Sequence, residues 1–232
     1  MPTRSVALAV AVLTFALAAS AQGWFSKRPP LSSLFPQSEE FQFEPPVPGS
    51  YPLPVIKTAP DGTLLDIHGV ERTLSEVLDG KISLVSFVYL MCTDEAGCPF
   101  AISTLFSIYE ASEKVPELRD DVQLVVISFD PERDTVEAIE SFAYPVTADK
   151  AAHRKLPMRV FTTRDEAALK PIIDGFGQAI DRPDDQEVIN HLLRMYLVDR
   201  GGKIRNIYGL GLIDPRLLMT DVETLLMTEG VR

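Results

Sequence analysis

The segment ISLVSFVYL, residues 82–90, is almost wholly apolar. A short apolar run of this length is typical of a strand that is covered on both faces of a sheet. The run VQLVVISF, residues 122–129, has the same character, and apolar residues at helical spacing follow Pro99 between the two runs. The order strand, helix, strand predicts a parallel βαβ unit at the centre of the domain.

The segments that follow extend this unit. Apolar spacing predicts a helix through 136–142, a strand at 158–162 and a helix over 165–176. The runs at 193–198 and 204–208 flank an Asp-Arg-Gly-Gly turn and predict a β-hairpin, and Asp214-Pro215 begins a last helix.

The segments that precede the first apolar run predict a second hairpin. Pro60-Asp61-Gly62 is a turn signal between Val55-Ile56 and Leu64-Leu65, and Leu74–Leu78 forms a short helix that Gly80 ends. The complete order predicts an α/β, thioredoxin-like fold over residues 56–232. It has a central mixed sheet with flanking helices and an N-terminal β-hairpin.

Residues 1–21 have the features of a signal peptide. Arg4 supplies a positive charge, Val6–Ala19 is an apolar run with one threonine, and Ala19-Ser20-Ala21 fits the small-x-small cleavage rule. We expect an exported protein, periplasmic or membrane-associated and facing the periplasm, whose signal segment is either cleaved or retained as an anchor. Prolines are dense from 29 to 60 and exclude a continuous helix, so residues 22–55 are predicted to form an extended arm that wraps or tethers the domain.

The amino-acid composition limits the classes of partner that this chain is expected to bind. Its 232 residues include 22 Lys and Arg against 33 Asp and Glu, for a formal net charge of −11. Such a surface repels phosphate backbones, which argues against nucleic-acid binding. A metal ion or a basic patch on another protein is compatible with the charge. The chain is long enough to bury a core without a disulfide framework.

The two cysteines lie in Cys92-Thr-Asp-Glu-Ala-Gly-Cys98-Pro99, directly after the predicted central strand. Functional sites of open α/β sheets gather at the carboxyl ends of the strands, which favours a functional dithiol over a structural disulfide. With Pro99 as the first helical residue, Cys98 would be the N-cap, where the helix dipole would make it the more acidic thiol. Asp94 and Glu95 oppose that effect in an empty dithiol and favour a bound cation.

His191 immediately precedes the strand predicted at 193–198, so its imidazole is expected at a strand end beside the cysteine segment. Two thiolates and one imidazole form a soft donor set that suits copper, especially Cu(I). His68 and His153 lie in polar surroundings and are interpreted as ordinary surface residues.

The segment Asp130-Pro-Glu-Arg-Asp134-Thr135 follows the second apolar run and lies at the same edge of the sheet. Capping of the next helix is sufficient to explain an aspartate at position 134. The alternative is that Asp130 or Asp134 orients the residues of the site.

A dithiol after FVYL (87–90), the segment ISFDPERDT (127–135) and a histidine before the strand leading to VDRGGKI (198–204) together resemble the SCO/SenC family. The resemblance extends from about Tyr51 to Leu226. It implies a thioredoxin-like protein that binds copper through two cysteines and a histidine and helps to assemble the binuclear copper centre of cytochrome c oxidase.

Carried over position by position, Cys92 and Cys98 match the thiolate ligands of that family and His191 the imidazole ligand. Asp130, Pro131 and Asp134 match its acidic loop. The family motif usually has three residues between the cysteines and a proline after the first. Here five residues intervene and that proline is missing.

The resemblance predicts a copper metallochaperone whose partners are copper, a thiol reductant and a client such as a cytochrome c oxidase subunit. Such a protein is not an enzyme in the strict sense. The alternative is an extracytoplasmic thiol–disulfide oxidoreductase that uses Cys92 and Cys98 as a redox-active pair. That class usually carries a proline before the penultimate strand, and no proline occurs here between Pro183 and Pro215. A thiol peroxidase ranks third, because Thr93 is the one weak polarising candidate near the cysteines.

Overall fold

The computed structural model describes residues 28–38, 40–182 and 189–230. Its strands are β1 Lys57–Thr58, β2 Thr63–Asp66, β3 Glu71–Thr73, β4 Ile82–Val88, β5 Val122–Ser128, β6 Met158–Thr162, β7 Ile180–Asp181, β8 Asn190–His191, β9 Arg194–Val198 and β10 Lys203–Gly209. Its α-helices are α2 Leu74–Leu78, α3 Cys98–Ala111, α4 Val136–Thr147, α5 Glu166–Phe176 and α6 Pro215–Glu229. Short 3-10 helices are η1 Leu31–Leu34, η2 Ser112–Lys114, η3 Pro116–Asp120, η4 Ala152–Arg154 and η5 Leu210–Leu212.

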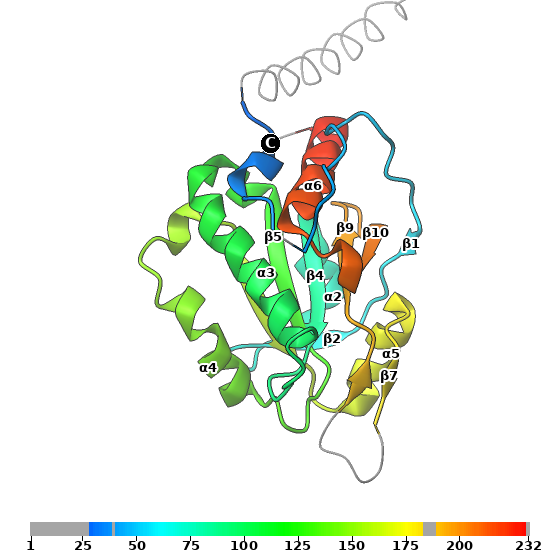
Figure 1. Cartoon of the computed structure of the whole chain (residues 1–232). Coiled ribbons are helices and arrows are strands. Elements are labelled where there is room, and N and C mark those ends of the chain that lie inside the picture. The colour runs from blue at the N-terminus through cyan, green and yellow to red at the C-terminus, as the bar shows by residue number, and fades with distance from the viewer. Residues whose placement is uncertain (1–27, 39, 183–188, 231–232) are drawn as a thin grey trace, which may run out of the picture.

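An eight-stranded mixed sheet with the order β1-β10-β9-β4-β5-β6-β2-β3 forms the centre of the molecule (Figure 1). β4 and β5 run parallel from the pair Ile82↔Val122 to the pair Val88↔Ser128, and β9 pairs with β4 antiparallel. Every residue of β4 and β5 is buried, because helices cover both faces of the sheet at this point. The predicted βαβ unit and the mixed α/β class are confirmed.

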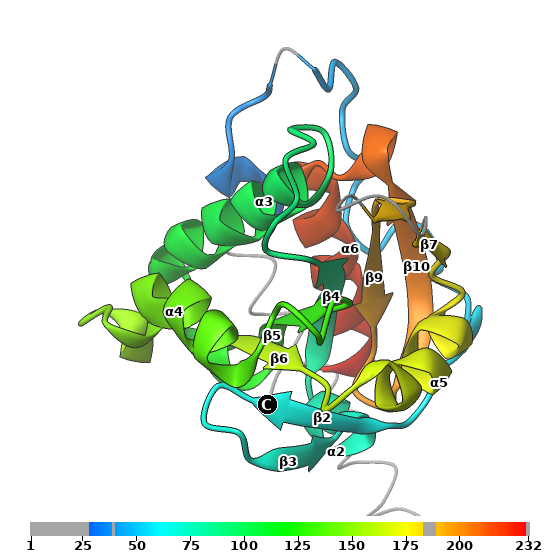
Figure 2. The same ribbon diagram turned by 90° about the horizontal axis from the view of Figure 1, so that it is seen from below.

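Helices pack on both faces of the central strands. α3 and α6 lie side by side on one face, and α5 lies on the other (Figure 2). From α5, the ring of Phe176 packs 5.0 Å from that of Phe87 in β4 and 4.8 Å from that of Tyr196 in β9. This aromatic cluster anchors β4 and β9. Because the two strands are antiparallel, the carboxyl end of β4 and the segment that precedes β9 lie at the same edge of the sheet.

The predicted hairpin between Val55-Ile56 and Leu64-Leu65 is wrong. β1 pairs with β10 at one edge of the sheet, whereas β2 pairs with β3 and β6 near the other edge. The connection through Pro60 crosses the end of α5, where a Cβ on Gly175 would lie 2.3 Å from Pro60 Cβ. A turn signal does not specify whether the strands on its two sides pair with each other. Here the segment through Pro60 packs against α5, and the two strands pair with different partners. The first hairpin of the domain is β2–β3.

The remaining predicted elements are present. α2 coincides with the predicted helix, β6 and the β9–β10 hairpin are confirmed, and Asp165 caps α5 by accepting a hydrogen bond from the Ala168 backbone nitrogen. β3, β7 and β8 were not predicted, because they are two or three residues long and mostly exposed.

The proline-rich segment lies along α6 as far as the structure describes it (Figure 1). The Leu31 backbone nitrogen donates to Glu223 Oε2 at 2.7 Å, and the Gly49 nitrogen donates to Thr224 Oγ1 at 3.0 Å. The Tyr51 hydroxyl donates to Asp221. These contacts hold the described part of the segment against α6. The predicted signal peptide, residues 1–21, lies outside the described residues. Among the residues that the structure describes, no helix is long and apolar enough to cross a membrane.

Candidate metal centre

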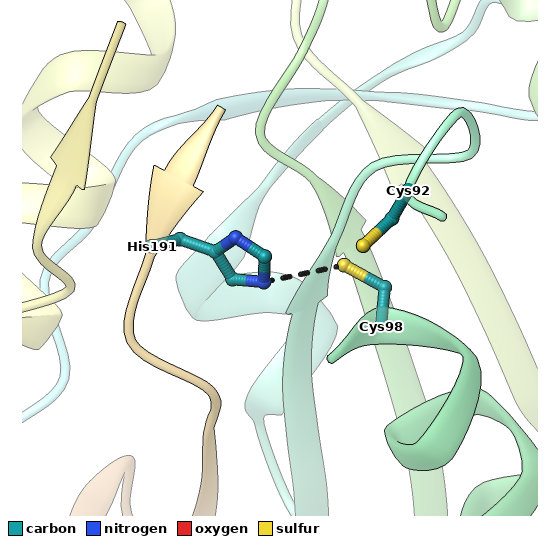
Figure 3. Close-up of side chains that lie close together, drawn as sticks. All are labelled: Cys92, Cys98 and His191. Atoms are coloured by element: carbon teal, nitrogen blue, oxygen red, sulfur yellow. Dashed lines mark hydrogen bonds between the residues drawn. The ribbon is translucent and has the colours of Figure 1, made fainter. Parts of the chain in front are cut away.

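Cys92, Cys98 and His191 lie together at the carboxyl edge of the sheet (Figure 3). Cys92 follows β4, Cys98 opens α3, and His191 ends β8. Their sulfur and ring-nitrogen atoms all lie within 4.8 Å of one another, and Cys98 Sγ is 3.4 Å from His191 Nε2. Among the described residues this is the one cluster of such side chains that could hold a metal ion.

Cys98 is fully buried, with 0% of its surface exposed. Gly97 is the N-cap of α3, so Cys98 is the first helical residue and not the predicted cap. Its sulfur accepts a hydrogen bond from the Tyr89 backbone nitrogen at 3.4 Å, which favours the thiolate. Burial nevertheless raises the pKa of the Cys98 thiol well above its ordinary value, and the neighbouring Cys92 adds to the rise. The predicted acidification of Cys98 by the helix is therefore wrong, because loss of hydration outweighs the helix terminus.

The loop between the cysteines is closed by a turn at Asp94. The Gly97 nitrogen donates to the Asp94 carbonyl at 2.8 Å, and the Ala96 nitrogen donates to Asp94 Oδ1 at 3.1 Å. A Cβ on Gly97 would lie 3.1 Å from that carbonyl oxygen, so a side chain at this position would force the turn to shift by a few tenths of an ångström. This turn lets five intervening residues bring the two sulfurs together.

The His191 ring is oriented by a backbone hydrogen bond. Nδ1 lies 3.1 Å from the Ile189 carbonyl oxygen, which can only accept, so Nδ1 carries the proton. The lone pair of Nε2 then faces the cysteines. Metal-ligating histidines are commonly held in this way through their second nitrogen.

Two aromatic rings that the sequence reasoning missed hold the imidazole in place. Tyr89 packs edge-on with its ring centroid 5.7 Å from that of His191, and the Phe129 centroid lies 5.0 Å away. Both rings are buried. Tyr89 directly follows β4, and Phe129 directly follows β5. The sequence signal for them was an aromatic residue at the end of each apolar run.

His191 belongs to a small sheet of β7 and β8 that is tied to the main body by polar contacts. Arg182, just after β7, donates to the Phe129 carbonyl and pairs with Glu166 at 2.8 Å. Gln178 Nε2 donates to the Leu192 carbonyl at 2.6 Å. Arg182 and Gln178 were not among the predicted site residues, because their partners are distant in sequence.

The acidic segment after β5 borders the site without entering it. Asp134 Oδ2 accepts from the Leu90 backbone nitrogen at 3.1 Å and from Ser128 Oγ at 2.6 Å. Thr135, and not Asp134, caps α4, so the capping interpretation of Asp134 is wrong. Asp134 binds the loop that precedes the cysteines instead, and burial raises its pKa. Asp130 is buried and forms ion pairs with Arg133 and Arg182.

The other two histidines lie outside the cluster. His68 is exposed in the turn between β2 and β3, and His153 is exposed with Nδ1 3.0 Å from the Lys150 carbonyl oxygen.

The donor set fits a soft metal ion. Bonds of about 2.0–2.3 Å from an ion to nitrogen and sulfur place neighbouring donors roughly 3.5–4 Å apart. The separations between the three donor atoms are close to this requirement. Thiolates and imidazole favour Cu(I) and Zn²⁺ over hard ions such as Mg²⁺.

The fold and the site define a thioredoxin-like protein with a Cys-Cys-His cluster at the carboxyl edge of its sheet. The SCO1/SenC family model matches residues 57–227. The chain belongs to this family.

Individual relatives agree with the family match. An SCO2-like protein of Rickettsia conorii is 29% identical over 153 residues, which cover 64% of this chain and 67% of that protein. The mitochondrial SCO2 homolog of Homo sapiens is 28% identical over 150 residues, covering 64% of this chain and 53% of that protein. The matched region thus spans about half to two thirds of these relatives.

Solved structures share the fold. The SCO1/SenC family lipoprotein from Bacillus anthracis aligns with a TM-score of 0.60 and 21% identity, over 73% of this chain and 95% of that one. Arabidopsis thaliana ScoI with copper bound aligns with a TM-score of 0.55 and 21% identity, over 75% of this chain and 99% of that one. These similarities confirm the predicted thioredoxin-like architecture.

Proposed function

We propose that this protein binds one copper ion through Cys92, Cys98 and His191 and delivers it to a respiratory cuproenzyme such as cytochrome c oxidase. The observation that carries the proposal is the convergence of the three donor atoms within 4.8 Å. Family membership supports it, since Sco structures from Arabidopsis thaliana and Bradyrhizobium japonicum hold copper. BsSco, whose solved structure shares the fold, is a member of the Sco family of cytochrome c oxidase assembly proteins.

The geometry suits an ion that is held and then released. Cys98 is buried behind the loop, whereas His191 is half-buried, so an acceptor can approach from the side of the imidazole. A site with three protein donors also leaves room for an incoming ligand, which a closed four-ligand structural site does not.

We propose further that the protein acts outside the cytoplasm, in the periplasm or at a membrane facing it. The features of residues 1–21 support this location. Both cysteines are unpaired in the structure, and because thiols tend to oxidise in that compartment, a thiol reductant is needed to keep them able to bind copper.

The second candidate function is thiol–disulfide exchange with a client. The proximity of the two sulfurs favours it. Both functions need the cysteines as thiolates, so the raised pKa of the fully buried Cys98 does not separate them. The neighbouring imidazole, held with its lone pair toward Cys98, is a feature that copper binding uses and disulfide exchange does not require.

A competition titration of the reduced protein with a chromophoric Cu(I) chelator tests the proposal. We expect one Cu(I) per chain. Cys92→Ser, Cys98→Ser and His191→Ala should each weaken binding by more than the roughly 10–100-fold that loss of an outer hydrogen-bond partner costs. His153→Ala is the matched control and should bind as the wild type does. Full-strength binding by His191→Ala would overturn the three-ligand site, and reduction of insulin at rates typical of thioredoxins would favour the second candidate.

A further inference from the structure

The first turn of α3, which carries Cys98, has little support from its own helix. Its N-cap, Gly97, has no side chain that could accept a hydrogen bond from the backbone nitrogens of this turn. The bond from the Ala101 nitrogen to the Gly97 carbonyl is 3.3 Å long, which exceeds the usual value of about 2.9 Å. Helix ends of this kind open more readily than helix centres. The position of the Cys98 sulfur therefore depends on contacts from outside the helix.

One such contact comes from the proline-rich segment. The ring centroid of Phe41 lies 6.3 Å from that of Phe100, which belongs to the first turn of α3. Aromatic rings at separations of about 4.5–7 Å attract one another beyond the effect of the apolar area that they bury. Phe41 is buried, and Phe100 is partly buried and packs against the hydrophobic core. The proline-rich segment therefore packs on the turn that carries Cys98.

A buried ion pair at the start of α6 fixes the place of Phe41. Arg216 is buried and pairs at 2.6 Å with Asp214, the N-cap of that helix. The same guanidinium donates to the Phe41 carbonyl at 2.7 Å, and its central carbon lies 5.6 Å from the centroid of the Phe43 ring. A buried guanidinium needs acceptors for its N–H groups, so the bond to Phe41 is costly to lose. Phe41 is thus held to α6 by its backbone and to α3 by its ring.

We propose that Phe41 is a positioning residue for the metal centre. Through its contact with Phe100 it holds the first turn of α3, and with it the Cys98 sulfur, within reach of the other two donor atoms. The proposal rests on the proposed function, because the sulfur that is held in place is a copper ligand. Phe41 precedes residues 57–227, which the family model matches, so this support comes from a part of the chain outside that match.

A second phenylalanine of the same segment provides a matched control. Phe35 is as well buried as Phe41, with 7% of its surface exposed against 6%, and it packs in the main hydrophobic core. Phe35→Ala and Phe41→Ala remove the same atoms, and both should lower the stability of the fold. A difference between the two variants at Cys98 therefore reports where each ring packs and not how much apolar volume is lost.

The first test needs no copper. In a Cys92→Ser background Cys98 is the one cysteine of the chain, so its rate of alkylation by iodoacetamide measures how often its sulfur becomes accessible. We expect Phe41→Ala to raise this rate about tenfold, and the rate to stay constant at low urea concentrations, as a local opening does. With Phe35→Ala the rate should instead grow with urea in step with global unfolding. If Phe41→Ala behaves in the same way as Phe35→Ala, Phe41 supports only the fold.

The second test measures Cu(I) affinity by chelator competition with both cysteines present. Phe41→Ala should bind copper about tenfold more weakly, as when an outer support of a metal site is lost, and Phe35→Ala should bind as the wild type does. Phe41→Leu refills most of the volume and should recover most of the affinity. In a Phe100→Ala background, Phe41→Ala should cost no further affinity, because the contact is already gone. Additive losses would show that Phe41 does not act through Phe100 and would overturn the proposal.

The outcomes separate the role of Phe41 from the proposed function. If the wild type binds no copper, the proposed function is wrong, and the alkylation rates still decide whether Phe41 holds Cys98 in place. If the wild type and both alanine variants bind copper equally and both alkylation rates follow global unfolding, the copper site stands and the positioning role is wrong. Phe41→Val with Phe35→Val as its control replaces the alanine pair in both tests if Phe41→Ala does not fold.

Discussion

The carboxylate of Asp134 holds the backbone of Leu90, with Oδ2 3.1 Å from the Leu90 nitrogen. The same oxygen accepts the Ser128 hydroxyl at 2.6 Å, so it joins the end of β5 to the segment that leads into the cysteine loop. Leu90 lies two residues before Cys92. The position of the Cys92 sulfur therefore depends on a carboxylate that lies outside the Cys-Cys-His cluster.

We predict that Asp134→Ala lowers Cu(I) affinity about tenfold, in line with the loss of other outer hydrogen-bond partners of metal sites. Asp134→Asn keeps an oxygen acceptor and should lose much less. Asp165→Ala is the control, because it removes the cap of α5, at a cost of about 1 kcal/mol, far from the cysteines. Chelator competition on all three variants checks this. Equal affinities for Asp134→Ala and Asp165→Ala would show that Asp134 supports only the fold.

The turn between the cysteines leads to a second prediction. Gly97→Ala places a Cβ 3.1 Å from the Asp94 carbonyl oxygen and 3.3 Å from Oδ2. Asp94 must shift by a few tenths of an ångström to make room, which displaces the Cys92 side of the loop relative to Cys98. We expect a several-fold loss of Cu(I) affinity with an almost unchanged melting temperature, since residues 93–96, which must give way, are exposed. Gly211→Ala, whose Cβ would meet nothing within 4 Å, should change neither quantity.

A third prediction concerns the contact that holds the β7–β8 sheet against the main body. Arg182→Ala removes the bond to the Phe129 carbonyl and the ion pair with Glu166. We expect weaker copper binding, because the His191 strand loses an anchor. In a His191→Ala background the same change should cost no further affinity, since the ligand that it positions is gone. Additive losses in the double variant would mean that Arg182 acts on the cysteines instead. Lys170→Ala, on the exposed side of α5, is the control.

The parts of this structure that were predictable from sequence are those encoded by local pattern. β4 and β5 are continuous apolar runs, which is the pattern of strands covered on both faces of a sheet. Once these strands are parallel, their carboxyl ends share an edge, and Cys92 and Cys98 follow one of them. The place of His191 followed from its position before β9, which pairs with β4.

The parts that were not predictable depend on contacts between segments distant in the chain. β1 is a two-residue edge strand with no pattern of its own, and its partner Ile204 lies far along the sequence. α6 was predicted from one apolar stripe, yet polar residues such as Asp221 and Glu223 are also buried, because the proline-rich segment covers that side. No periodicity in α6 alone could reveal that cover.

The burial of Glu223 leads to a prediction about stability and pH. Burial raises the pKa of its carboxyl above the usual value, and the hydrogen bond from the Leu31 nitrogen offsets only part of that rise. The folded protein therefore binds this proton more tightly than the unfolded chain does. The contribution of Glu223 to stability falls as pH rises from the ordinary carboxyl range to the raised value, and above that range the cost of the buried charge is constant.

Glu223→Gln tests this sign, because glutamine resembles the protonated acid and still accepts from Leu31. The variant should gain stability relative to the wild type at pH 7 and little or none at pH 4, measured by urea unfolding at both values. Glu137→Gln is a control of opposite sign. Hydrogen bonds from its own backbone and from Thr135 lower the pKa of Glu137, so its contribution is present at pH 7 and lost as pH falls. If Glu223→Gln changed stability equally at both pH values, the pKa of Glu223 would not be raised in the folded protein, and the hydrogen bond from the Leu31 nitrogen would offset the burial cost in full.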